Sequence, residues 1–276
     1  MKTVFGFVVI GAGVYLLVLF FLYMFQERLI FLPSAGLTDT PAAAGLEYEE
    51  IYLDTEDGIR IHGWWVESEF EKPAVIFFHG NAGNISGRVS IVEAFHRLGY
   101  PVFIVDYRGY GLSEGRPSEE GLYKDADAVW KWVADKGFSA DEIVVVGRSM
   151  GGAIAAYVAA KYQPAALALE STFTSIADIA AGIYPIFPVR LLARVEMPTL
   201  EFMNQFDGPV LIGHSPADEV VPYSHGRNLL DEAGDRATWF ELEGGHNDGF
   251  FRSRNAWDLA YGEFLDKIRD GLKEVQ

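Results

Sequence analysis

A serine between two glycines, placed between an apolar run and a helical pattern, restricts the fold of this chain most. The run Ile143–Val146 predicts a buried strand, and Gly147-Arg148-Ser149-Met150-Gly151 follows it directly. An alanine-rich helical pattern then runs from residue 152 to residue 162. This setting predicts a sharp turn that presents the serine hydroxyl above the edge of a sheet. Flanking glycines allow such a turn because they lack a Cβ atom. A chance match in a glycine-rich chain is the alternative, and it leaves the adjoining strand and helix unexplained.

The other apolar runs predict an α/β fold with a mostly parallel, eight-stranded sheet. Tyr48–Leu53 and Ile59–Val66 flank the turn signal Thr55-Glu56-Asp57-Gly58, which predicts a β-hairpin. Six later runs alternate with helical patterns, and this predicts helices on both faces of the sheet. The runs are Ala74–Phe78, Val102–Val105, Ile143–Val146, Ala166–Leu169, Val210–Gly213 and Thr238–Leu242, and the helical patterns lie near 86–98, 118–136, 150–162, 223–233 and 255–273.

The N-terminal segment predicts a transmembrane anchor over residues 1–31. Val4–Phe25 carries no charge, and as a helix it would span about 33 Å, enough for the hydrocarbon core of a bilayer. A cleaved signal peptide is the alternative, but its apolar region is usually about 7–15 residues long and ends in small residues. We therefore expect a single-pass membrane protein. Lys2 on one side, against Glu27 and Arg28 on the other, favours a cytoplasmic N-terminus and an extracytoplasmic domain.

The rest of the chain is predicted to hold a connector and one domain. Residues 32–47 are rich in turn formers and indicate a connector, and residues 48–276 form the domain. The segment 172–208 is too long for an ordinary loop, and its length predicts a short helical cap. Its aromatic side chains either pack in the core or line an apolar acyl pocket; they are Phe173, Tyr184, Phe187, Phe202 and Phe206.

Composition excludes several classes of partner and site. A net charge of −17 argues against a nucleic-acid partner, because phosphate binding needs a basic surface. The same charge disfavours docking of the domain on anionic lipid. Without cysteine, the chain has no disulfide, no cysteine metal ligand and no cysteine nucleophile. No zinc-type His-Glu-x-x-His motif or calcium-type aspartate spacing is present, so we expect no metal site.

A serine nucleophile needs a base, and His246 is the best candidate among six histidines. It lies in the glycine-rich segment Gly244–Gly249, just after the last predicted strand, where a loop can carry an imidazole over the sheet edge. The other histidines have competing explanations. His62 and His96 are expected to be structural, His225 to cap or solvate a helix, and His214 to line the pocket.

Asp218 is the candidate acid that orients the histidine. It lies in the loop after the predicted strand Val210–Gly213. We expect its neighbour Glu219 to point elsewhere. Glu170 also follows a predicted strand and is the alternative acid, whereas Asp106 is interpreted as a structural loop anchor.

Two backbone N–H groups are candidates for holding a developing oxyanion. One belongs to Met150, which follows the serine at a helix N-terminus. The second is expected in His79-Gly80-Asn81-Ala82-Gly83-Asn84, where Asn81 is the best candidate and the glycines permit close approach of the backbone.

These motifs together resemble a known family. The chain is similar to membrane-anchored α/β-hydrolase-domain proteins of the serine-aminopeptidase-like group, in the Bem46-like subgroup. The segments that carry the likeness are His79–Asn84, Asp106–Gly111 with Ser113-Glu114-Gly115, Ser118–Tyr123 and Gly147–Gly152. The resemblance implies the α/β-hydrolase fold, a Ser149–Asp218–His246 triad and no cofactor. The family covers esters, thioesters and amides, so the likeness does not choose a substrate.

The sequence therefore favours a serine hydrolase that acts on an ester or thioester. An acyl or lipid-like small-molecule substrate is our first expectation, because the anchor holds the site near a bilayer. One alternative is a peptidase or amidase, for which Glu170 or Glu201 would bind a terminal amine. Another is a membrane-tethered binding protein without turnover. Nothing in the sequence indicates the oligomeric state.

Overall fold

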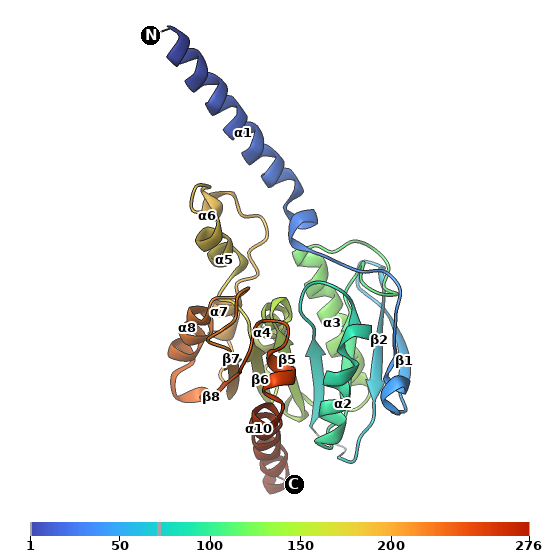
Figure 1. Ribbon diagram of the computed structural model, residues 1–276. Helices are drawn as coiled ribbons and strands as arrows, with labels where there is room; N and C mark the ends of the chain where they lie inside the picture. The colour runs from blue at the N-terminus through green and yellow to red at the C-terminus, as the bar shows by residue number, and fades with distance from the viewer. Residues whose placement is uncertain (1, 71–72, 276) are drawn as a thin grey trace.

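A computed structural model describes residues 2–70 and 73–275 and contains a sheet covered by helices on both faces (Figure 1). The strand order is β1-β2-β4-β3-β5-β6-β7-β8; β2 runs antiparallel to β1 and β4, and the remaining neighbours are parallel. The strands are β1 (Glu49–Asp54), β2 (Arg60–Val66), β3 (Ala74–Phe78), β4 (Val102–Asp106), β5 (Ile143–Arg148), β6 (Ala166–Glu170), β7 (Val210–His214) and β8 (Ala237–Glu241). The predicted fold class is confirmed. Residues 1, 71–72 and 276, included in the predicted bounds, lie outside the described residues.

Each inner strand supplies two hydrophobic cores, one on each face of the sheet. In β3, Ile76 and Phe78 join the core under α3, α4, α7 and α8, while Val75 and Phe77 join the core under α2 and α10. A strand buried on both faces has to be apolar at every position, which explains its unbroken apolar run. The helices of the domain body are α2 (Val89–Arg97), α3 (Glu119–Asp135), α4 (Met150–Tyr162), α8 (Tyr223–Ala233), α9 (Gly249–Arg252) and α10 (Arg254–Val275), with short 3₁₀ turns at η1 (Pro41–Ala44), η2 (Ile85–Arg88), η3 (Ala140–Glu142) and η4 (Gly234–Arg236).

The N-terminal helix α1 (Lys2–Ile30) stands away from the domain body, at the end opposite the C-terminus (Figure 1). Its segment Thr3–Ile30 is long and apolar enough to cross a membrane. The backbone departs from helical geometry at Phe25, with φ −115° and ψ 17°, so the last turn is set at an angle to the rest.

The connector after α1 follows the domain surface. Pro33 forms a bridge with Gly83, and Ala35 forms one with Gly111. Phe31 is buried in the core at the start of the connector. The connector therefore joins the anchor to the loops that follow β3 and β4.

The insert between β6 and β7 forms three short helices, α5 (Ile176–Ile183), α6 (Val189–Leu192) and α7 (Thr199–Met203). The aromatic side chains of the insert fall into two groups. Phe173 and Phe206 are buried in the core, and Phe202 packs edge-on against Tyr123 and Tyr157. Tyr184 and Phe187 instead lie at the outer end of the insert and line an apolar groove described below.

Candidate active site

Ser149 occupies a strained turn between β5 and α4. Its φ of 53° and ψ of −123° are unusual for a residue with a side chain, and such a conformation costs about 1–3 kcal/mol. The flanking glycines are required by close packing. A Cβ atom on Gly147 would lie 2.2 Å from the Gly151 carbonyl oxygen, and one on Gly151 would lie 2.0 Å from that of Phe78. The packing around the elbow therefore holds the serine in this conformation.

Three loops bring Ser149, His246 and Asp218 into one hydrogen-bonded chain. His246 Nε2 lies 3.0 Å from Ser149 Oγ, and His246 Nδ1 lies 2.7 Å from Asp218 Oδ2. The residues come from the loops after β5, β7 and β8, whose carboxyl ends meet at one edge of the sheet. With the Nδ1 proton directed to Asp218, Nε2 is free to accept the serine proton.

Asp218 is held as an anion by its surroundings. Burial raises the pKa of this carboxyl, but hydrogen bonds from His246 and from the Val220 and Val221 N–H groups outweigh it and leave the pKa below its usual value. The two N–H groups donate to Oδ1 at 2.9 and 2.7 Å, which leaves Oδ2 for the imidazole. A carboxylate in this position stabilises an imidazolium.

The main chain of His246 is fixed as well as its ring. Its N–H donates to Glu219 Oε2 at 3.0 Å, and its carbonyl oxygen accepts a hydrogen bond from the Arg148 guanidinium. The expectation that Glu219 points elsewhere is therefore wrong. Sequence reasoning also missed Arg148, because its role depends on a partner 98 residues away in the sequence.

Glu170, the alternative acid, is bound to other groups. Its carboxylate accepts a hydrogen bond from Trp257 Nε1 at 2.7 Å and lies 3.2 Å from Arg148 Nε. The Nδ1 position of His246 is taken by Asp218. Glu170 therefore supports the arginine that holds the His246 loop.

The two candidate oxyanion donors lie in the loop after β3 and at the start of α4. Met150 is the first residue of α4, where N–H groups have no partner within the helix. The side chain of Asn81 is engaged elsewhere: it donates to the Ile30 carbonyl at 2.5 Å and accepts from the Leu32 N–H and the Tyr110 hydroxyl at 3.0 and 2.9 Å. Only its backbone N–H is therefore available for an oxyanion.

Comparisons with known proteins identify the family. A profile of the alpha/beta hydrolase fold matches residues 73–188. The alpha/beta hydrolase domain-containing protein WAV2 of Arabidopsis thaliana is 35% identical, over 94% of this chain and 92% of its own length. The chain belongs to the α/β-hydrolase-domain proteins. Within this family, the protein bem46 of Schizosaccharomyces pombe is 37% identical over 76% of this chain and 75% of its own, which confirms the predicted subgroup.

Two more matches concern the membrane anchor and the fold of this chain. An uncharacterized membrane protein of Saccharomyces cerevisiae is 35% identical over 89% of this chain and 91% of its own length. Together with the apolar helix α1, this relative indicates membrane anchoring. Among solved structures, an esterase of Pyrococcus furiosus superposes with a TM-score of 0.72 at 21% identity, over 86% of this chain and 98% of the esterase. At this identity the match shows a shared fold.

Asp106 and His79 form a buried pair that joins the loop after β3 to the end of β4. Asp106 Oδ1 accepts from the Ile85 N–H at 2.8 Å, as expected for a loop anchor, and lies 3.6 Å from His79 Nε2. Burial raises the pKa of Asp106 to about 7 and lowers the pKa of His79 to about 3. The loop after β3 is thus tied to the end of β4 rather than free.

The remaining histidines are structural in different ways. His62 is buried on β2, and His96 lies in the last turn of α2. His214 is buried and lies against Asp218: its Nε2 is 2.9 Å from the Val221 carbonyl oxygen, and burial lowers its pKa. His225 accepts from the Thr174 N–H at 3.2 Å and so joins α8 to the insert rather than capping its own helix. Within residues 2–70 and 73–275, no group of three or more His, Asp or Glu side chains is placed to hold a metal ion.

Proposed function

We propose that this protein is a serine hydrolase that cleaves the ester or thioester bond of an acyl, lipid-like substrate. The observation that carries the proposal is the hydrogen-bonded chain from Ser149 through His246 to Asp218. Its members meet at the sheet edge, and we assign the oxyanion site that acyl transfer requires to the N–H groups of Met150 and Asn81.

Acylation begins at the serine. Ser149 Oγ attacks the carbonyl carbon while His246 Nε2 takes the serine proton, and Asp218 stabilises the resulting imidazolium. The carbonyl oxygen becomes an oxyanion held by the N–H groups of Met150 and Asn81. When the tetrahedral intermediate collapses, the bond to the alcohol or thiol breaks, and that leaving group receives the proton from His246.

Deacylation repeats these steps with water. His246 removes a proton from water, the hydroxyl attacks the acyl carbon, and a second oxyanion forms in the same place. Collapse of this intermediate breaks the bond to Ser149 Oγ, which recovers the proton from His246. The products are a carboxylic acid and the free enzyme.

Two observations favour esters over peptides. Glu170, one candidate for binding a terminal amine, is buried and already paired with Arg148 and hydrogen-bonded to Trp257. Glu201, the other candidate, is exposed on α7. The apolar α1 beside the domain supports a substrate that partitions into membranes. We also propose that α1 spans the membrane once and that the hydrolase domain is extracytoplasmic.

A fluorophosphonate probe tests the proposal on the purified full-length protein. We expect the wild type to be labelled covalently and Ser149→Ala to remain unlabelled. Hydrolysis of p-nitrophenyl butyrate should fall by about 10³-fold or more in the variant, because the acyl-enzyme cannot form. Thr172→Val is a control: it removes a hydroxyl that donates to the Ser149 carbonyl at 2.7 Å but leaves the nucleophile in place. Labelling of Ser149→Ala, or an unlabelled wild type, would contradict the proposal.

A further inference from the structure

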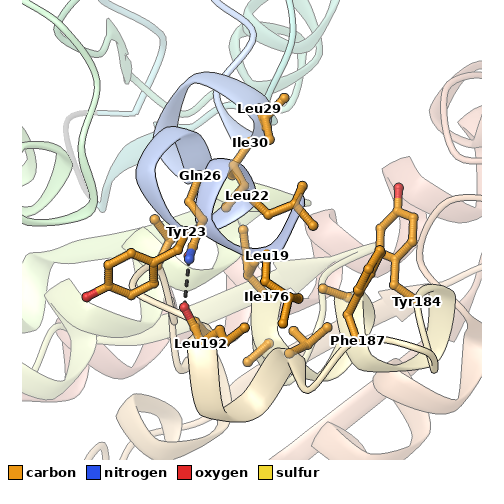
Figure 2. A pocket seen from close by; sticks show the side chains of 15 residues that line it. Leu19, Leu22, Tyr23, Gln26, Leu29, Ile30, Ile176, Tyr184, Phe187 and Leu192 are labelled. Carbon is orange, nitrogen blue, oxygen red and sulfur yellow. Dashed lines mark hydrogen bonds between the residues drawn. The ribbon is translucent and has the colours of Figure 1, made fainter. Parts of the chain in front are cut away.

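An apolar groove lies between α1 and the outer helices of the insert. It has a volume of about 420 Å³, within the range of about 300–1,000 Å³ that ligand pockets occupy. Figure 2 shows Leu22 and Ile30 of α1 on one side, with Ile176, Phe187 and Leu192 of the insert on the other. The groove is lined mainly by apolar side chains, so its chemistry suits a hydrocarbon chain.

Polar contacts at two points along α1 hold this helix against the insert. Gln26 donates to the Leu192 carbonyl at 2.6 Å (Figure 2) and accepts from the Arg194 N–H at 2.8 Å. Farther along the helix, the Tyr15 hydroxyl donates to the Ile186 carbonyl at 2.8 Å. Between these contacts the insert presents small side chains to α1, among them Ala180. The groove is therefore unfilled between these two points of contact.

The outer end of the insert has the surface of a membrane-embedded segment. Tyr15 lies about 20 Å along α1 from its domain end, and Phe187 stacks on it with ring centroids 6.0 Å apart. The side chains of Ile186 and Leu191 there are 73% and 83% exposed, although the chain as a whole is acidic. If α1 crosses a hydrocarbon core of about 30 Å, this end of the insert lies within that core.

The charges of this segment support the same placement. Between residues 176 and 193 the only charged side chains are Asp178 and Arg190. They form an ion pair of 2.9 Å, so the segment carries no net charge. Placing an unpaired charge in a bilayer costs free energy, and the ion pair between Asp178 and Arg190 avoids much of that cost.

The inner end of the groove lies next to the loop that follows β3. Ile30 lines the groove, and its carbonyl oxygen accepts the hydrogen bond from the Asn81 side chain. Asn81 is the candidate oxyanion residue, and its neighbour Gly80 packs against the serine: a Cβ atom there would lie 3.2 Å from Ser149 Cβ. The groove therefore ends one hydrogen bond away from the loop that faces the nucleophile.

We propose that this groove is the acyl-chain subsite of the enzyme and that it takes the chain of an ester lipid directly from the bilayer. The chain would pass between α1 and the insert, with its carbonyl directed to Ser149. Because lipid tails are as apolar as the groove, the chain moves from one apolar medium to another without crossing water. The proposal rests on the serine hydrolase function proposed above and adds the subsite that binds the acyl chain and the route by which the chain arrives.

A pair of tryptophan variants tests the subsite in full-length protein reconstituted into phosphatidylcholine vesicles. Ala180→Trp fills the groove, whereas Ala181→Trp is the matched control on the neighbouring position of α5, which does not line it. We expect Ala180→Trp to lower kcat/KM for vesicle-borne p-nitrophenyl palmitate by at least about tenfold and to change that for p-nitrophenyl butyrate less than about twofold. The control should leave both values near those of the wild type.

Photocrosslinking gives a readout that does not need turnover. A phosphatidylcholine with a diazirine on its acyl chain should crosslink peptides of α1 and α5 in the wild type and in Ser149→Ala, and Ala180→Trp should reduce the yield at least about fivefold. If Ala180→Trp lowers neither palmitate hydrolysis nor crosslinking, or lowers the hydrolysis of both esters equally, the subsite proposal is overturned. If crosslinking is as expected but neither ester is hydrolysed and no fluorophosphonate label is found, the hydrolase function fails while the lipid-chain site stands. If Ala180→Trp lowers crosslinking but leaves palmitate hydrolysis unchanged, the substrate role is overturned and the groove holds a structural lipid.

Discussion

His246 is held by three groups, and each controls a different degree of freedom. Asp218 sets the orientation of the ring through Nδ1, while Glu219 and Arg148 bind the N–H and the carbonyl of its main chain. These restraints hold His246 in one conformation before the substrate binds. Little conformational entropy is therefore lost when the transition state forms. Glu219 is exposed, so its contribution can be removed without opening the core.

Replacement of Glu219 separates positioning of the histidine from fold stability. In Glu219→Ala the His246 N–H loses its acceptor, and we expect kcat for p-nitrophenyl butyrate to fall about tenfold, equivalent to about 1.4 kcal/mol. KM and the melting temperature should change little. Glu219→Gln keeps an acceptor oxygen and should recover most of the rate. Equal losses in both variants would show that the charge of Glu219, rather than the hydrogen bond, supports His246.

At the scale of elements, the helix α1, the loop after β3 and the insert form one connected unit. Asn81 binds both the last carbonyl of α1 and the first N–H of the connector, and Gln26 binds α1 to the insert at the C-terminal end of α6. Only a few polar contacts hold the insert to α1, whereas α7 packs directly on α4. We therefore expect the outer helices α5 and α6 to open more readily than the rest of the insert.

Hydrogen exchange of reconstituted protein measures this difference. Gln26→Met preserves the side-chain volume but removes two hydrogen bonds to the insert, each worth about 1 kcal/mol. We expect amides in residues 176–192 to exchange on the order of tenfold faster, with little change in α7. Gln163→Met is the matched control, because Gln163 bridges the end of α4 to Gln205, away from α1. Unchanged exchange in residues 176–192 would show that apolar packing alone holds the insert to α1.

At the scale of the whole molecule, charge and apolar surface are separated. The chain carries a net charge of −17, yet α1 and the outer end of the insert are almost uncharged and lie beside each other. An acidic body is repelled by anionic lipid headgroups, so the membrane contact has to come from the apolar end. This division predicts a hydrolase domain that faces the membrane through α1 and the insert.

Cysteine labelling tests which side of the membrane the domain occupies. The natural chain has no cysteine, so single substitutions report their own positions. In intact cells, we expect a membrane-impermeant maleimide to label Asp135→Cys, at an exposed position of α3, and to leave Thr3→Cys unlabelled. Detergent should make both positions reactive. The reverse pattern in intact cells would place the domain in the cytoplasm.

Much of the fold could be read from local patterns, because each pattern reflects the physics of its own segment. The apolar run before Ser149 forms β5, and the alanine-rich pattern after it forms α4. The candidate site could be predicted for a similar reason: glycine-rich loops after strand ends place side chains at one edge of a parallel sheet. Whether those residues carry the reaction is a prediction that labelling and kinetics have to test.

The sequence by itself determined the order of strands and helices along the chain, the apolar N-terminal helix, and the position of a serine on a sharp turn. These properties depend on hydrophobic period, length and the special backbone of glycine, which act over a few neighbouring residues. Only the tertiary structure decided that Glu219 and Arg148 hold His246, that Glu170 supports Arg148, and that Tyr184 and Phe187 line a groove with α1. Such contacts join segments as far as 171 residues apart, and no local pattern carries a signal for a partner that distant.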